Sequence, residues 1–224
     1  MIWIFGDSYS TSFSNPTTLN FWAKDYISWK GYIPKTFGEI ISEELDTEIT
    51  FLSESSVDND TIFELICENA PLINEGDIII IGWSSVLRFR ISNDLNEWVR
   101  VMPTNIDKLN ILSKQTLNDV LINRSLPIYK EEYRKRRDFI NWIFKNNAVI
   151  HWTPFVDQFD FILGYIDVTT IKTETNGKIN DGHYSEIGHR QLAKNFMDLI
   201  KYDNIRKFGK SNDISKKNPW KRLL

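Results

Sequence analysis

The sequence predicts an α/β fold, with a central parallel sheet covered by helices on both faces. Short apolar runs alternate with longer stretches of helical spacing, which is the order of β-α-β units. One of these runs, 78–81, is four consecutive isoleucines, a composition typical of a strand buried on both faces. The length of 224 residues fits a single domain of this class.

Four strands and four helices are expected along the chain. The strands are short apolar runs bounded by glycine or polar residues, at 2–5, 48–52, 77–82 and 148–152. The helices carry apolar residues three or four positions apart, at 32–45, 58–69, 129–144 and 184–200. A further helical stretch at 106–121 falls within a segment that is longer than a crossover needs.

The predicted domain spans residues 1–206, and its long segment, 88–129, is interpreted as an insertion that covers the open end of the sheet. The last 18 residues, 207–224, carry six Lys or Arg against one Asp. This basic tail is compatible with disorder or with docking on a partner. A basic run at 134–137 is explained by a solvated helix face.

Composition excludes several classes of protein. The net charge of −3 gives no reason to expect nucleic acid or an anionic membrane as partner. A single cysteine, Cys67, excludes an intramolecular disulfide and a cysteine-based zinc cluster, and no metal or organic cofactor is implied. No apolar run is long enough for a membrane helix, and the apolar N-terminus lacks the basic region of a signal peptide. The expected location is the cytoplasm, or outside the cell after release without a signal peptide.

The pentapeptide GDSYS at 6–10 directly follows the first predicted strand. Its Ser8 stands where open α/β sheets place their ligands, and a Ser8 N–H at a helix start could donate to an oxyanion. Asp7 could brace the loop through hydrogen bonds to nearby backbone groups. The alternative is that Ser8 caps a helix and Asp7 is a turn residue.

A second polar motif, NDGHYSEIGH at 180–189, precedes the last predicted helix. A serine hydroxyl is a poor nucleophile unless a base takes its proton. His183 could supply that base, and Asp181 could hold its tautomer and stabilise the imidazolium. An ordinary polar loop before a capped helix is the alternative. His189 is a rival base, which we interpret as structural.

These two motifs resemble those of the SGNH (GDSL-type) hydrolase superfamily, and they lie at both ends of the chain in the family's order. The resemblance implies a flavodoxin-like three-layer α/β/α fold. It also implies Ser8 as nucleophile, His183 as general base and Asp181 as the acid that orients it. Many members carry the acid one position earlier, where this chain has Asn180. The family comprises esterases, lipases and carbohydrate deacetylases.

The two middle blocks of the family's pattern differ in this chain. Where the family has a glycine whose N–H joins the oxyanion hole, this chain has Ser55 or Ser56. Any such residue can donate its N–H, but serine lacks the freedom of glycine at positive φ. Where the family has an asparagine, this chain has Ser84, whose hydroxyl is a shorter and less fixed donor. Either Ser84 donates, or Asn59 supplies the amide.

Substrate contacts are expected from residues that follow the third and fourth strands. Trp83 and Arg88 could line a cleft, and Arg88 could bind a carboxylate or phosphate through its fork of donors. An exposed surface arginine is the alternative. Trp152 could stack on a sugar or acyl group, and His151 could contact substrate; core packing is the alternative for both.

The leading hypothesis is a serine esterase that forms an acyl-enzyme on a small-molecule or carbohydrate ester, for example an O-acetylated sugar. A binding protein with a degenerate oxyanion hole is a second hypothesis, supported by the serines at two hole positions. A nucleotide-binding module that uses residues 6–10 as a phosphate loop is a third. The absence of a glycine-rich loop argues against it.

Overall fold

The centre of the molecule is a five-stranded sheet with the order β2-β1-β3-β6-β7, in which all neighbouring strands are parallel. The computed structural model describes residues 1–14, 21–92, 98–101, 126–155, 163–164 and 167–208. The strands are β1 (Ile2–Gly6), β2 (Ile49–Ser53), β3 (Ile78–Gly82), β6 (Ala148–Thr153) and β7 (Leu163–Gly164). The predicted parallel α/β fold is confirmed, and each of the four predicted strands ends within one residue of its predicted bounds.

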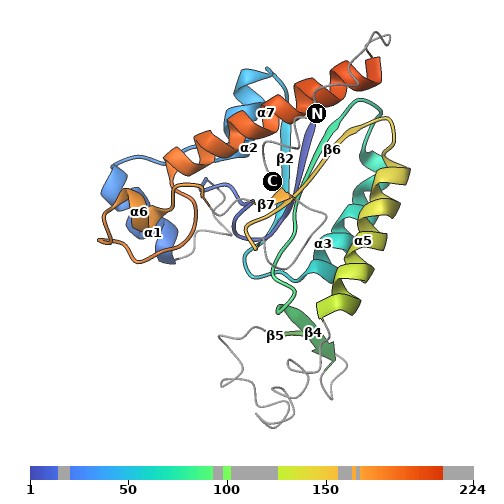
Figure 1. Cartoon of the computed structure of the whole chain (residues 1–224). Helices are drawn as coiled ribbons and strands as arrows, with labels where there is room; N and C mark the ends of the chain where they lie inside the picture. Colours follow the sequence, from blue (N-terminus) through green and yellow to red (C-terminus); the bar gives the residue numbers. More distant parts are fainter. Residues whose placement is uncertain (15–20, 93–97, 102–125, 156–162, 165–166, 209–224) are drawn as a thin grey trace.

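Helices cover both faces of the sheet (Figure 1), which makes three layers. Helices α2 (Phe37–Glu44) and α7 (Glu186–Phe208) lie against one face, and α3 (Asn59–Asn69) and α5 (Leu126–Ile143) against the other. Successive residues of a strand point to opposite faces. Accordingly, Ile80 packs in the core beneath α2 and α7, whereas Ile79 and Ile81 pack in the core beneath α3 and α5.

Two helix boundaries differ from the prediction by more than three residues. The helix predicted over 32–45 begins only at Phe37, because Pro34 disfavours a helical conformation at the preceding residue. The carboxylate of Glu39 fixes this start by accepting hydrogen bonds from the Thr36 N–H (2.7 Å) and hydroxyl (3.0 Å). At the other end of the chain, α7 extends to Phe208, so it includes the first two residues of the predicted basic tail.

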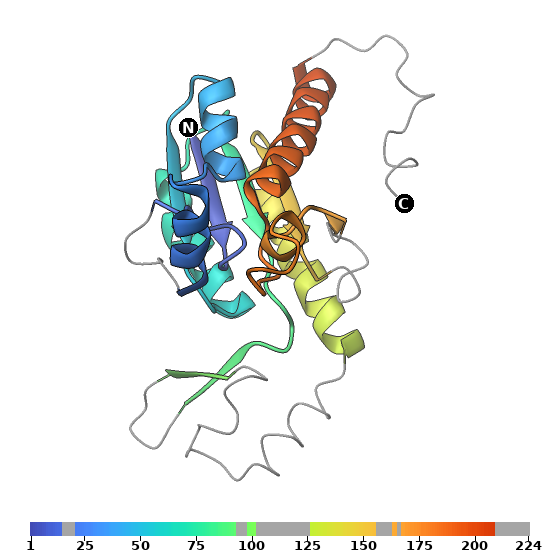
Figure 2. The same ribbon diagram turned by 90° about the vertical axis from the view of Figure 1, so that its left-hand side faces the viewer.

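The prediction missed six short elements. These are α1 (Phe21–Lys30), the 3-10 helix Ala70–Leu72, α6 (Ile171–Glu174), β7 and the antiparallel hairpin of β4 (Phe89–Ser92) and β5 (Trp98–Val101). The hairpin lies within the predicted insertion after the third strand, and it extends from the end of the sheet where β3 finishes (Figures 1 and 2). The predicted helix at 106–121 and the residues from 209 onward lie outside the described residues.

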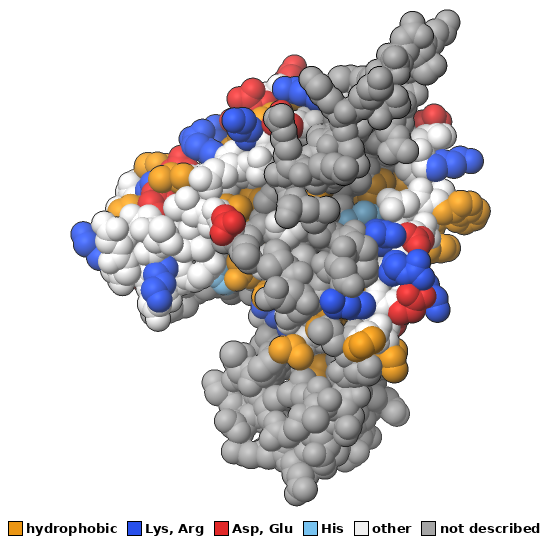
Figure 3. Space-filling model, viewed as in Figure 1, with side chains coloured by type: hydrophobic (Ala, Val, Ile, Leu, Met, Phe, Trp, Pro, Cys, Tyr) orange, Lys and Arg blue, Asp and Glu red, His pale blue; other side chains and the backbone are white. Residues whose placement is uncertain are grey.

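The basic run at 134–137 lies on α5 among acidic partners. Arg134 and Lys135 are exposed and both pair with Glu131, while Arg136 pairs with Asp60 at 2.7 Å. Figure 3 shows acidic and basic side chains intermixed at the right-hand edge, where α5 lies. The run is therefore part of a mixed-charge helix face, as predicted. Within the described parts of the chain, no helix combines the length and apolar character that crossing a membrane would require.

Candidate active site

The carboxyl ends of β1, β2 and β3 finish side by side. Gly6 at the end of β1 pairs with Ser53 of β2 and with Gly82 of β3. A Cβ atom at Gly6 or Gly82 would overlap the hydroxyl oxygen of Ser10, which is fully buried against both glycines. The chain after β1 therefore folds back tightly onto the sheet edge, at the place where parallel α/β sheets bind their ligands.

A hydrogen-bonded turn, and not a helix, carries Ser8. The N–H of Ser10 donates to the Asp7 carbonyl (2.9 Å), and the N–H of Tyr9 donates to the Asp7 carboxylate (3.1 Å). Asp7 thus braces the loop, as the sequence predicted. The turn leaves the Ser8 side chain directed toward the loop that precedes α7.

Ser8, His183 and Asp181 form one chain of short hydrogen bonds, although 175 positions separate the serine from the histidine. Ser8 Oγ lies 2.9 Å from His183 Nε2. His183 Nδ1 lies 2.7 Å from Asp181 Oδ1, which also accepts the His183 backbone N–H at 2.7 Å. Because a carboxylate can only accept, Nδ1 carries the ring proton and the Nε2 lone pair faces the serine hydroxyl. This is the arrangement that a serine nucleophile and its base require.

The environment of Asp181 keeps its carboxyl group charged. Burial alone raises the pKa of Asp181, but the hydrogen bonds and charge of His183 outweigh burial and hold this pKa below its usual range. A charged Asp181 can stabilise an imidazolium at His183. Asn180, the alternative position for the acid, is exposed to solvent.

Aromatic rings support His183 from one side. Tyr9 stacks on the imidazole with ring centroids 4.5 Å apart, and Phe155 meets Tyr9 edge-on at 5.8 Å. Burial, and then the charge of Asp7, raise the pKa of Tyr9 to about 12, so its phenol stays neutral. Sequence reasoning missed Tyr9 and Phe155 as site residues. The position of Tyr9 directly after Ser8 was the available signal.

The two other histidines are core residues. His189 is 4% exposed, its Nδ1 accepts the Phe37 N–H at 3.3 Å, and burial lowers its pKa to about 3. His151 accepts the indole N–H of Trp83 at Nδ1 (3.1 Å), so its Nε2–H donates to Asn141 (3.2 Å). Burial also lowers the pKa of His151 to about 3. The structural interpretation of His189 and the core alternative for His151 agree with these contacts.

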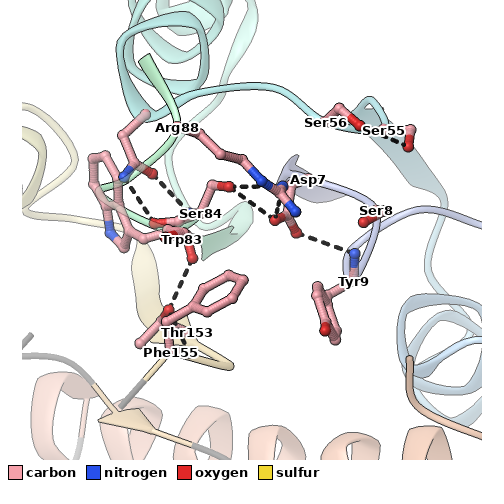
Figure 4. Close-up of polar contacts among 12 residues, drawn as sticks. Asp7, Ser8, Tyr9, Ser55, Ser56, Trp83, Ser84, Arg88, Thr153 and Phe155 are labelled. Carbon is pink, nitrogen blue, oxygen red and sulfur yellow. Dashed lines mark hydrogen bonds and ion pairs between the residues drawn. The ribbon is translucent and has the colours of Figure 1, made fainter. Parts of the chain in front are cut away.

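A second polar cluster, made of Asp7, Ser84 and Arg88, lies at the same sheet edge (Figure 4). The Ser84 hydroxyl donates to Asp7 Oδ2 at 2.9 Å. Arg88 Nη1 donates to the same Asp7 oxygen (2.7 Å) and to Ser84 Oγ (2.9 Å). Asp7 is 1% exposed, so this network neutralises a buried carboxylate. Arg88 is therefore not a freely exposed surface arginine.

Asn59 does not supply the amide that was predicted as an alternative oxyanion donor. It is fully buried, and its side chain clamps the backbone of Ser84: Nδ2 donates to the Ser84 carbonyl (2.8 Å), and Oδ1 accepts the Ser84 N–H (2.7 Å). The amide thus fixes the position of the segment after β3. The Ser84 hydroxyl, the other predicted donor, is directed to Asp7.

Ser56 is one of the two serines that we compared with the glycine of the SGNH hydrolases. Its backbone has a conformation that favours glycine. Its φ is +67°, in the left-handed region. The segment that carries it lies beside the turn after β1, because the Glu54 N–H donates to the Gly6 carbonyl at 3.1 Å. Figure 4 shows Ser55 and Ser56 on this segment, with hydroxyl oxygens 3.5 Å apart.

Trp83 and Trp152 do not line a site open to substrate. Both are 0% exposed. Trp83 packs in the core beneath α3 and α5, and Trp152 packs in the core beneath α2 and α7. The predicted substrate contacts of both tryptophans are therefore corrected to core packing. Strands β3 and β6 are buried up to their last residues. Because successive residues point to opposite faces of the sheet, the indoles of Trp83 and Trp152 lie in opposite cores.

No group of acidic, histidine or cysteine side chains in the described part of the chain has the arrangement to hold a metal ion. Comparisons of this chain with family models, with curated proteins and with solved structures find no match. The resemblance to the SGNH hydrolases therefore rests on the motifs themselves, and a function has to be argued from the geometry of the site.

Proposed function

We propose that the protein is a serine ester hydrolase, with Ser8 as nucleophile, His183 as general base and Asp181 as the acid that orients it. The observation that carries this proposal is the hydrogen-bonded chain from Asp181 through His183 to Ser8, with distances of 2.7 and 2.9 Å. Such a constellation is recognised by its geometry and by the role of each member, and not by its fold.

In the first half of the reaction, Ser8 Oγ attacks the ester carbonyl carbon while His183 Nε2 takes the hydroxyl proton. The carbonyl π electrons move to oxygen and produce a tetrahedral oxyanion. When the intermediate collapses, the C=O bond re-forms and the bond to the alcohol oxygen breaks. His183 returns its proton to the departing alcohol, and an acyl-Ser8 ester remains. Asp181 stabilises the transient imidazolium.

In the second half, water repeats these steps on the acyl-enzyme. His183 takes a proton from water as the water oxygen bonds to the acyl carbon, and the second intermediate collapses with release of Ser8. His183 then gives its proton to Ser8 Oγ, so that a carboxylic acid leaves and the free enzyme is restored.

A small acyl group is the proposed substrate feature. The half-buried rings of Tyr9 and Phe155 provide apolar surface beside His183, and this supports an acyl group of acetyl size. An O-acetylated carbohydrate remains the proposed natural ester. The two tryptophans no longer support sugar stacking, because both are buried.

The test is labelling with a fluorophosphonate together with hydrolysis of p-nitrophenyl acetate. We expect the wild-type protein to be labelled and to hydrolyse the ester, and Ser8→Ala to do neither while its thermal midpoint changes little. Ser12→Ala is the matched control, because Ser12 lies on the same segment but its hydroxyl donates to Glu39 (2.7 Å). This variant is expected to keep both properties.

A binding protein on the same fold is the second candidate. The observation that favours it is the engagement of the Ser84 hydroxyl with Asp7, which removes the side-chain donor expected at that position. If the wild-type protein is neither labelled nor active, the hydrolase proposal is wrong and the binding protein is favoured.

A further inference from the structure

An ester hydrolase needs hydrogen-bond donors at the oxygen that becomes negative in the tetrahedral intermediate. Two predicted side-chain donors are occupied elsewhere in this structure. A hydroxyl has one proton, and Ser84 donates its proton to Asp7. The Asn59 amide is fully buried and bound to the backbone of Ser84. A different side chain could therefore act at the sheet edge.

Arg88 is the side chain with donors to spare. Its Nη1 binds Asp7 and Ser84, whereas Nε and Nη2 have no hydrogen-bond partner among the described residues. The Arg88 side chain is 19% exposed, so part of it is accessible to a small molecule. The Nη1 side of the guanidinium is held by Asp7, the residue directly before Ser8.

A series of contacts with neighbouring rings connects Arg88 to His183. The guanidinium carbon lies 5.9 Å from the centroid of Phe155, Phe155 meets Tyr9, and Tyr9 stacks on His183. The charge of Arg88 also acts on Tyr9, since it opposes the rise that burial and Asp7 cause in the pKa of Tyr9. In Figure 4 the guanidinium lies next to Asp7, and Ser8 and Tyr9 follow Asp7 on the same turn.

We propose that Arg88 is a catalytic residue whose free guanidinium edge donates to the oxyanion formed by attack of Ser8. This inference rests on the proposed esterase function. A hydrogen bond from a charged donor is roughly twice as strong as one between neutral groups. The ion pair with buried Asp7 fixes the guanidinium before substrate arrives, so little reorganisation accompanies the reaction. Asp7 would then both brace the turn of Ser8 and position the donor.

The test compares Arg88→Gln and Arg88→Lys on two esters, neutral p-nitrophenyl acetate and anionic mono-p-nitrophenyl succinate. For Arg88→Gln we expect kcat to fall by about 10²–10³-fold on both esters, with KM changed by less than about threefold. The rate of fluorophosphonate labelling is expected to fall in parallel, because its tetrahedral adduct resembles the intermediate. Arg90→Gln is the matched control, since Arg90 lies on β4 of the hairpin and pairs with Glu64 of α3.

Arg88→Lys distinguishes two roles of Arg88: a hydrogen-bond donor to the oxyanion, or only a positive charge that pairs with Asp7. Lysine keeps a positive charge for Asp7 and so protects the fold, but it lacks the second edge of the guanidinium. We expect this variant to keep most of the thermal stability and still to lose at least about tenfold in kcat. Wild-type kcat in a stable Arg88→Lys would show that Arg88 only neutralises Asp7, and would overturn the inference.

Three further outcomes are distinct. A loss confined to KM for the succinate ester would show that Arg88 binds a substrate carboxylate, and the oxyanion assignment would be wrong. If the wild-type protein shows no Ser8-dependent turnover of either ester, the proposed function fails and the assignment of Arg88 fails with it. Normal wild-type turnover with unaffected Arg88 variants would remove the Arg88 assignment alone.

Discussion

Two polar clusters meet at the carboxyl end of the sheet, and they are built in different ways. The first, Ser8 with His183 and Asp181, draws its base and acid from one short loop, so their relationship is visible in the sequence. The second, Asp7 with Ser84 and Arg88, joins segments 77 or more positions apart through one buried carboxylate. A local motif can be recognised in a sequence, whereas a network between loops becomes visible only in the fold.

The largest expected effect concerns the base of the first cluster. We expect His183→Ala to lower kcat/KM for p-nitrophenyl acetate by at least about 10⁴-fold, because Ser8 loses the group that accepts its proton. Addition of Ser8→Ala should lower it little further, since the two residues act as a unit. His189→Gln is the control: it loses stability, as a buried residue, but its folded fraction keeps most activity. The reverse result would identify His189 as the base.

The next effect tests the charge of Asp181. Asparagine at position 181 keeps a polar group beside His183 but cannot stabilise an imidazolium, so Asp181→Asn should lower kcat by about 10²–10⁴-fold. Steady-state kinetics near neutral pH provide the measurement. Asn180→Ala changes the exposed neighbour and should leave kcat within about twofold of the wild type. Equal losses in both variants would mean that the loop as a whole, and not the Asp181 charge, matters.

A smaller effect is expected when the second cluster is disturbed at Ser84. Ser84→Ala removes one donor from buried Asp7 and should lower the free energy of unfolding by about 1–3 kcal/mol, with a loss in kcat of less than about tenfold. Denaturant unfolding and steady-state kinetics measure the two quantities.

Ser84→Asn sharpens the same comparison. Because Ser84 is fully buried, the larger side chain should lower stability further and should not raise kcat. A rise of about tenfold in kcat would mean instead that position 84 reaches the oxyanion, as the family's pattern implies.

The smallest effect concerns the strained backbone beside the site. Ser56→Gly relieves a left-handed conformation that is unfavourable for serine, partly offset by the greater freedom of glycine in the unfolded chain. We expect the free energy of unfolding to rise by about 0.5–1 kcal/mol with unchanged kcat. Ser55→Gly, one position earlier and without a positive φ, should lower stability. A stability loss in Ser56→Gly would mean that its side chain matters more than its backbone.

The sheet and the grouping of Ser8, Asp181 and His183 could be predicted because each leaves a local signal. A run of isoleucines identifies β3, and two motifs identify Ser8 and His183. The missed elements lack such signals: β7 is two residues long, and the hairpin of β4 and β5 has no long apolar alternation. The start of α2 depends on Pro34 and Thr36, which override an apolar spacing that already begins at Ile33.

Side-chain direction explains the errors at the site. A tryptophan at the end of a strand can face a cleft or a core, and only the helices packed above Trp83 and Trp152 decide for the core. The amide of Asn59 could have reached the oxyanion hole, but its partner on the Ser84 backbone is set by how α3 lies against β1. Tyr9 and Phe155 come together from loops far apart in the chain.

The contact of Ser10 with Gly6 and Gly82 also has an evolutionary consequence. Its hydroxyl fills the space where either glycine would carry a Cβ atom, and it has no hydrogen-bond partner within the described structure. Steric fit therefore couples positions 6, 10 and 82. A diverged homologue with alanine at position 82 would need a smaller residue at position 10, so these two positions are expected to change together.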